Sequence, residues 1–144
     1  MPADFAWRFW TNVSNWTLDS DVESVEIDGP FAAGARGATI GRISGRIEWR
    51  VVEAGSGRAV IEFPVPKAVA RFAWQFVETV RGTTITQRCW LEGESASKLA
   101  RNFGPVLEAG IPDGMRKLCL AMEAASARWP AGGVMAQKGP AATG

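Results

Sequence analysis

The 144-residue sequence predicts an α+β fold, in which a curved antiparallel sheet of about six strands grips a long C-terminal helix. Apolar residues first recur with a helical period, then alternate with polar residues along short segments, and return to the helical period near the C-terminus. The turns between the alternating segments are too short for parallel crossovers, so the strands should form a meander. Because one helix cannot cover several twisted strands flatly, the sheet should curl around it.

The opening helix is expected over residues 3–16, because Phe5, Phe9 and Val13 fall at every fourth position. From residue 22 onward, apolar residues recur at every second position. Strands are expected at residues 22–28, 39–43, 46–52, 58–63, 71–77 and 83–91, with turns or breaks at 29–30, 54–57, 64–66 and 81–82.

The C-terminal part of the chain is expected to be helical in two pieces. The first covers residues 96–109 and is interrupted by Gly104-Pro105, whereas the second begins near Pro112 and runs to about Arg128. Residues 1–129 should form a single domain. Residues 130–144 are rich in Ala, Gly and Pro and are expected to be a disordered tail.

Composition excludes several classes of protein. Lys and Arg number 16 against 15 for Asp and Glu, a balance that argues against a dedicated nucleic-acid binder. The chain has no His, so His-dependent triads and the usual zinc sites are excluded. Its two cysteines form neither a disulfide framework nor a metal cluster, and we expect no metal and no cofactor. Neither a signal peptide nor a membrane span is evident, so a cytoplasmic location is expected.

The order of the elements and several motifs resemble the START-like superfamily, also called SRPBCC, the helix-grip family of polyketide cyclases/dehydrases and lipid-transport proteins. AWRFWTNVSNW is similar to its aromatic first helix, VESVEIDGPFAAGARGATI to its second and third strands, RIEWRVVEAGSGRAVIEF to its hairpin, and RGTTITQRCWLEG to its last strand. The resemblance covers residues 3–128. It implies a deep apolar cavity between the sheet and the long helix, and no shared catalytic residues.

One departure from the family concerns its first strand, which precedes the first helix and lies between the second strand and the last. Here a helix follows Met1 at once, so either that strand is absent or the given sequence starts within the family's usual frame. The strand around Val25 and the strand around Cys89 should then each keep an open edge. Open edges favour association, which predicts a homodimer or the filling of the gap by another stretch of the same chain.

Strand parity and the helical stripe define the inner face of the fold. The candidate ligand-binding residues on this face are Trp49, Ile61, Phe63, Trp74, Phe76, Gln87, Cys89, Met115, Leu118 and Met122. Ile47, Phe72, Ile85 and Leu91 share the face but are not in the candidate set. These side chains either wall a cavity suited to flat apolar ligands or simply fill a core with small voids.

Two inner-face residues have a polar group. The buried amide of Gln87 would need a partner, which could be a ligand hydroxyl or carbonyl, a backbone group or a water molecule. Cys89 is interpreted as a small buried apolar residue, because nothing near it in the sequence would activate the thiol. The outer face is predicted to be a solvent-exposed surface with interleaved opposite charges, and not a phosphate groove. Its charged residues are Arg42, Arg46, Arg50 and Arg88 with Glu48, Glu62 and Glu78.

The main functional hypothesis is therefore a non-catalytic carrier or sensor of a hydrophobic small molecule, such as a lipid, a sterol or an aromatic polyketide-like compound. The alternative is a cyclase or dehydrase that acts on an aromatic ketide substrate. In it Gln87 would polarise a carbonyl group, and a carboxylate or an arginine at the mouth of the pocket would move protons. A third class, an adaptor without a ligand, would have a filled core.

Overall fold

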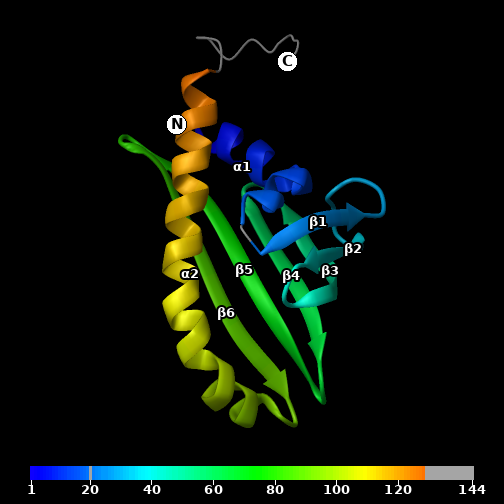
Figure 1. Cartoon of the computed structure of the whole chain (residues 1–144). Coiled ribbons are helices and arrows are strands. Elements are labelled where there is room, and N and C mark those ends of the chain that lie inside the picture. Colours follow the sequence, from blue (N-terminus) through cyan, green and yellow to red (C-terminus); the bar gives the residue numbers. More distant parts are fainter. Residues whose placement is uncertain (20, 129–144) are drawn as a thin grey trace.

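The computed structural model describes residues 1–19 and 21–128, so the predicted tail at 130–144 lies outside the described residues. The elements in chain order are α1 (Ala3–Thr11), the 3-10 helix η1 (Val13–Leu18), β1 (Val22–Ile27), β2 (Arg36–Gly41), β3 (Gly45–Gly55), β4 (Arg58–Val65), β5 (Ala68–Thr79), β6 (Gly82–Gly93) and α2 (Ala96–Ala127). The six strands pair antiparallel in sequential order, and α2 runs along the concave side of the curved sheet (Figure 1). The predicted fold class is confirmed, and β1 and β6 form the two edges of the sheet.

The expected opening helix at 3–16 is wrong in its second half, because α1 ends at Thr11 and a 3-10 turn follows. The hydroxyl of Thr11 donates to the Trp7 backbone carbonyl, and the side-chain amide of Asn15 donates to the Phe9 backbone carbonyl, both at 2.8 Å. Such side-chain bonds compete with the regular helical ladder and favour its end.

The second strand is displaced from the expected 39–43, because its last residue is Gly41. The carboxylate of Asp21 accepts hydrogen bonds from the Ile43 backbone N–H and the Ser44 hydroxyl, each at 3.0 Å. A side chain at Gly41 would collide with the Ser44 hydroxyl. Asp21 therefore holds the turn at 42–44 and sets the register of β2 against β3.

The break expected at 64–66 is shorter than predicted. Pro64 is paired with Val69 inside the β4–β5 ladder, and the chain turns at Pro66 and Lys67, where Lys67 has a φ of 59°. The hydroxyl of Ser95 donates to the Pro66 carbonyl at 2.5 Å, which joins the start of α2 to this turn.

The interruption expected at Gly104-Pro105 is also wrong, because α2 is continuous through Pro105 and Pro112. The two prolines are seven residues apart, so both lie on one exposed face of the helix. The hydrogen bonds that the prolines cannot donate are therefore on the solvent side of the helix. Losing them there costs least, because on that side of a curved helix the carbonyl groups tilt toward water.

The core lies at the end of the sheet that α1 and η1 cover. Trp10 is its centre, with ring centroids 4.7 Å from Trp74, 5.5 Å from Phe76 and 5.8 Å from Trp16. Met122 of α2 closes the cluster and is fully buried. Each such side chain contributes about 1.5–3 kcal/mol through burial.

Candidate functional site

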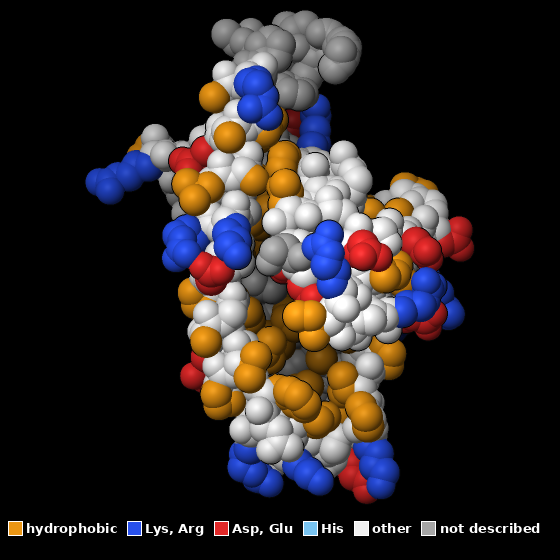
Figure 2. Space-filling view, viewed as in Figure 1, with side chains coloured by type: hydrophobic (Ala, Val, Ile, Leu, Met, Phe, Trp, Pro, Cys, Tyr) orange, Lys and Arg blue, Asp and Glu red, His pale blue; other side chains and the backbone are white. Residues whose placement is uncertain are grey.

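A trough separates the first half of α2 from the sheet, at the end of the inner face that α1 and η1 leave uncovered. Figure 2 shows this hollow in the lower part of the molecule, with apolar side chains along both sides. Inward-facing, partly exposed side chains in this region define its walls: Phe63, Phe72, Cys89 and Leu91 from the sheet and Leu107, Ile111 and Met115 from α2.

The strand register explains why this end of the sheet is hollow. Ala70 of β5, which is 9% exposed, lies between Phe63 of β4 and Leu91 of β6, and its small side chain rises less above the sheet than its larger neighbours do. One row further along, Phe72 replaces the alanine, and its ring centroid is 5.2 Å from that of Phe63. The alanine forms the floor of the trough and the two phenyl rings form a wall.

The opposite wall belongs to one stripe of α2. Leu107, Ile111 and Met115 recur at helical spacing and continue to the buried Met122, so they share its sheet-facing side. Phe103, four residues before Leu107, lies at the edge of this stripe and is 54% exposed, whereas Val106 lies on the other side of the helix and is 66% exposed. Of the strands, β6 is the one that α2 packs against. The second half of α2 also contacts α1 and η1.

Gln87 lies where the trough meets the core. Its register partner on β5 is Trp74, which contacts Trp10, and both Gln87 and Trp74 are partly exposed. Within residues 1–19 and 21–128, the Gln87 amide has no hydrogen-bond partner. It can therefore donate one hydrogen bond and accept another at the inner end of the trough.

The two thiols are not activated. Burial raises the pKa of Cys89 above its ordinary value, and burial together with the nearby Glu123 raises the pKa of Cys119. Both thiols therefore stay protonated at neutral pH, and neither is a nucleophile of the thiolate type.

The ten candidate residues fall into three groups. Trp49, Ile61, Phe76 and Met122 are buried in the core, where the Trp49 indole N–H donates to the Thr39 hydroxyl at 3.0 Å. Trp74, Gln87 and Leu118 lie between the core and the trough. Phe63, Cys89 and Met115 line the trough, and Phe63 also packs against the core. Strand and helix periodicity place all of these on the inner face, but they do not tell which end of that face is filled.

Four trough residues are absent from the candidate set. Phe72 and Leu91 share the parity of the candidates, and Ile111 shares the helical stripe, so the signal was present. Leu107 follows the Gly104-Pro105 pair, which conceals its continuity with that stripe.

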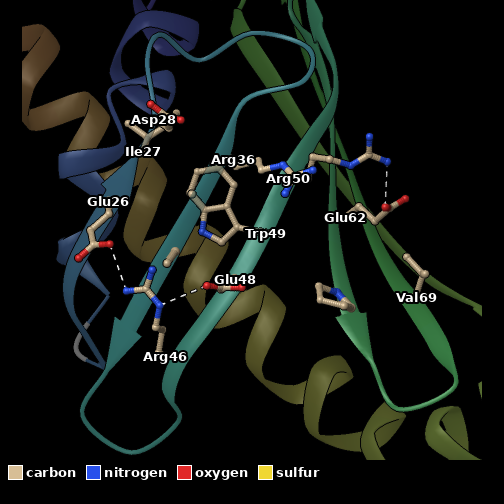
Figure 3. Close-up of a pocket in the computed structure, with 13 residues that line it drawn as sticks. Glu26, Ile27, Asp28, Arg36, Arg46, Glu48, Trp49, Arg50, Glu62 and Val69 are labelled. Atoms are coloured by element: carbon tan, nitrogen blue, oxygen red, sulfur yellow. Dashed lines mark hydrogen bonds and ion pairs between the residues drawn. The ribbon is translucent and has the colours of Figure 1, made fainter.

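A second pocket lies on the outer face of the sheet and has a volume of about 600 Å³. Figure 3 shows its charged side chains, which come mainly from β1 to β4. Arg46 pairs with Glu26 at 3.1 Å and with Glu48 at 3.4 Å, while Glu62 pairs with Arg50 at 3.1 Å and with Arg71 at 3.0 Å. We call this pocket the outer groove.

The outer face with interleaved opposite charges that the sequence predicts is confirmed for most of the residues named for it. Glu78 is an exception, because it has the inward parity of Phe76 and its carboxylate accepts the Ala3 backbone N–H at 2.8 Å. Arg88 lies over the Trp90 ring, with its guanidinium carbon 6.0 Å from the ring centroid.

Among residues 1–19 and 21–128, no group of three or more potential ligand side chains could hold a metal ion. None of the helices in this part of the chain has the length and apolar character that crossing a membrane requires.

No protein-family model and no curated protein matches the sequence. Solved structures are similar in fold. TTHA0849 from Thermus thermophilus superposes with a TM-score of 0.66 at 15% identity, covering 87% of this chain and 92% of that one. A point mutant of norcoclaurine synthase from Thalictrum flavum, in complex with a transition-state analogue, gives 0.63 at 10% identity and covers 87% and 89% of the two chains.

A second norcoclaurine synthase structure from Thalictrum flavum gives a TM-score of 0.62 at 10% identity, over 88% of this chain and 80% of that one. Identities this low show a shared fold and nothing about shared chemistry. The comparisons and the topology together show that the chain adopts a helix-grip fold.

Proposed function

We propose that this protein binds and carries a hydrophobic small molecule in the trough, with a lipid, a sterol or an aromatic polyketide-like compound as the ligand class. One observation carries the proposal: large apolar side chains remain partly exposed on both walls, although the other end of the inner face is densely packed. Covering this surface with an apolar ligand would contribute about 25 cal/mol per Å² of apolar area removed from water.

The walls also suggest the chemistry of the ligand. The trough residues named above carry no charge, so a neutral molecule is favoured over an ion. The rings of Phe63 and Phe72 offer flat contact surfaces, and the flexible side chain of Met115 can adapt to irregular shapes. Gln87 would orient the ligand through one hydroxyl or carbonyl group.

The alternative function, a cyclase or dehydrase that acts on an aromatic ketide, is less well supported by the chemistry of these residues. Gln87 can polarise a carbonyl by hydrogen bonding, but an amide does not take up or release protons at neutral pH. Cys89 stays protonated because of its burial. A carboxylate or an arginine at the mouth would have to move the protons, and neither is among the trough residues named above. We therefore favour binding over catalysis.

The test uses the protein as purified from cells and a neutral apolar fluorophore, N-phenyl-1-naphthylamine. Native mass spectrometry should detect a co-purifying hydrophobic molecule. Ala70→Phe should fill the floor of the trough and weaken fluorophore binding at least about tenfold. The control is Ala73→Phe, which places the same ring on the outer face of the same strand and should leave binding unchanged.

Two outcomes would overturn the proposal. One is a ligand-free protein whose fluorophore binding is equal in the two phenylalanine variants, with both variants folded by circular dichroism. The other is turnover of an aromatic ketide substrate by the purified protein, which would favour the cyclase or dehydrase. Loss of that turnover in Gln87→Ala would then assign the carbonyl-polarising role.

The homodimer expected from the open edges remains a prediction. The edge strand β6 spans 12 residues and pairs on one side with β5, which makes it a long template for association. The Met1 carbonyl accepts a hydrogen bond from the Thr83 hydroxyl at 2.7 Å, so the N-terminal residue lies against the start of this strand. Sedimentation velocity at several concentrations would test the dimer.

A further inference from the structure

The outer groove contains two arginines that face each other on adjacent strands. Arg36 of β2 lies directly opposite Arg50 of β3 in the strand register. Figure 3 shows the side chain of Arg36 reaching toward Arg50, which continues toward Glu62. Like charges directly opposite each other destabilise a sheet unless a counter-charge neutralises them.

The other ionic contacts of the groove leave Arg36 unsatisfied. Arg46 is neutralised by Glu26 and Glu48, and Glu62 bridges Arg50 and Arg71. Within the described part of the chain, Arg36 has neither an ion pair nor a side-chain hydrogen bond. Its guanidinium group therefore keeps all five N–H donors available in the groove.

Arg50 is held in place beside it. The Glu62 side chain is 18% exposed and accepts hydrogen bonds from both Arg50 and Arg71, which restrains the Arg50 guanidinium. Arg50 uses one terminal nitrogen for this bond, so further N–H groups remain for a second acceptor. An anion placed between the two arginines would thus meet one restrained and one free guanidinium group.

The groove also has an apolar part, where the accessible side chains of Pro64 and Val69 line the pocket. A ligand that consists of an oxyanion attached to a small apolar group would match both parts. The arginine pair would hold the oxyanion, and the apolar group would contact the side chains of Pro64 and Val69.

We propose that the outer groove is a second binding site, in which Arg36 and Arg50 together hold the oxyanion of an organic phosphate or carboxylate. The site is separate from the trough, because it lies on the opposite face of the sheet. The sequence pattern did not reveal it, since Arg36 is outside the alternating charges of the third and fourth strands. Only the register brings Arg36 opposite Arg50.

Asp28 competes with the anion for Arg36. The Asp28 backbone N–H donates to the Arg36 carbonyl at 2.8 Å, and Asp28 lines the same groove without pairing its carboxylate with this arginine. A carboxylate this near repels a bound anion and can capture the guanidinium by a rotamer change. Its removal should therefore strengthen anion binding.

The test titrates the protein with inorganic phosphate, phenyl phosphate and benzoate, followed by ¹H–¹⁵N NMR of the backbone and of the arginine Nε groups. Saturable shifts should centre on β2 and β3. Arg36→Gln should weaken binding by about tenfold or more, and Asp28→Asn should strengthen it about two- to threefold. Arg58→Gln is the matched control, because Arg58 is an exposed residue on β4 without an ion pair in the described structure.

The three probes separate the sources of the oxyanion. Tighter binding of either phosphate probe than of benzoate identifies a phosphate ligand, whereas tighter binding of benzoate identifies a carboxylate. The proposal is overturned if no probe gives saturable shifts at β2 and β3, or if Arg58→Gln weakens binding as much as Arg36→Gln. None of these outcomes depends on the trough, so they are independent of the proposed carrier function.

Discussion

The two ends of the inner face share the same strands and the same alternation, but one is filled and the other is hollow. Along β5 the inward apolar residues are Ala68, Ala70, Phe72, Trp74 and Phe76. The two large rings at the end of this series meet the aromatic residues of α1 and η1, whereas the alanines lie on the side of the first half of α2. The core therefore lies where the large rings of β5 meet α1 and η1, and the trough lies where the small side chains of β5 face the first half of α2.

The two halves of α2 repeat this difference. Met122 in the second half is fully buried, while the first half contains Gly104, Gly110 and two prolines. A Cβ atom added at Gly104 or Gly110 would meet nothing within 4 Å, so these glycines are not required by close packing. Each glycine costs about 1 kcal/mol of helix stability relative to alanine. The first half of α2, which forms one wall of the trough, is therefore the less stable half of the helix.

The largest effect is expected from placing a charge in the filled end. Met122→Asp should lower the free energy of unfolding by about 3–5 kcal/mol, because the carboxylate would be buried without a partner. Urea denaturation measures the change. Leu120→Asp is the matched control, since Leu120 is 60% exposed on the same helix and should change stability by about 0.5 kcal/mol or less. A loss below about 0.5 kcal/mol for Met122→Asp would contradict the assigned helix face.

A direct comparison of the two ends truncates one phenylalanine in each. Phe76→Ala should cost about 3–5 kcal/mol, because Phe76 is buried among the rings of Trp7, Trp10 and Trp74. Phe72→Ala should cost only about 1–2 kcal/mol, because one side of its ring already faces the trough. Both values come from the same urea titrations. Equal losses would mean that the trough is packed as tightly as the core.

The sequence predicted which face of the sheet each side chain occupies better than it predicted where the inner face is hollow. Two-residue alternation correctly assigned Gln87 and Cys89 to the inner face, because side-chain direction in a strand follows from backbone geometry alone. The hollow end could not be predicted in this way, since it depends on which inward residues the opening helix reaches. The outer groove was missed for a related reason: the pairing of Arg36 with Arg50 depends on the turn that Asp21 holds.

Glu62 lies on the outer face between the core residue Ile61 and the trough residue Phe63, and it ties β4 to both neighbouring strands. Hydrogen bonds from Arg50 and then from Arg71 hold the pKa of Glu62 below its usual value, although burial opposes this. A lowered pKa in the folded state contributes stability above the usual glutamate pKa, and that stability is lost as the pH falls through the folded value.

Glu62→Gln should therefore lower the free energy of unfolding by about 1 kcal/mol at neutral pH. The difference from the wild type should shrink as the pH falls below the ordinary range of a glutamate. Urea denaturation across acidic and neutral pH measures it, with Glu53→Gln as a control on β3, because Glu53 is exposed and has no ion pair among the described residues. A difference that stays constant with pH would show that the charge of Glu62 is not what ties the strands.

The smallest effect sharpens the comparison of the two halves of α2. Gly110→Ala should stabilise the first half by about 0.5–1 kcal/mol, because alanine restricts the unfolded chain and meets no obstacle in the helix. Hydrogen exchange of the α2 amides measures this locally, and the gain should be confined to the segment that faces the trough. Ala124→Gly is the reciprocal change at an exposed position of the second half and should accelerate exchange there by a similar free energy. If the wild-type amides of the first half already exchange as slowly as those around Met122, the trough wall is as firmly held as the core, and the contrast between the two ends lies in side-chain size alone.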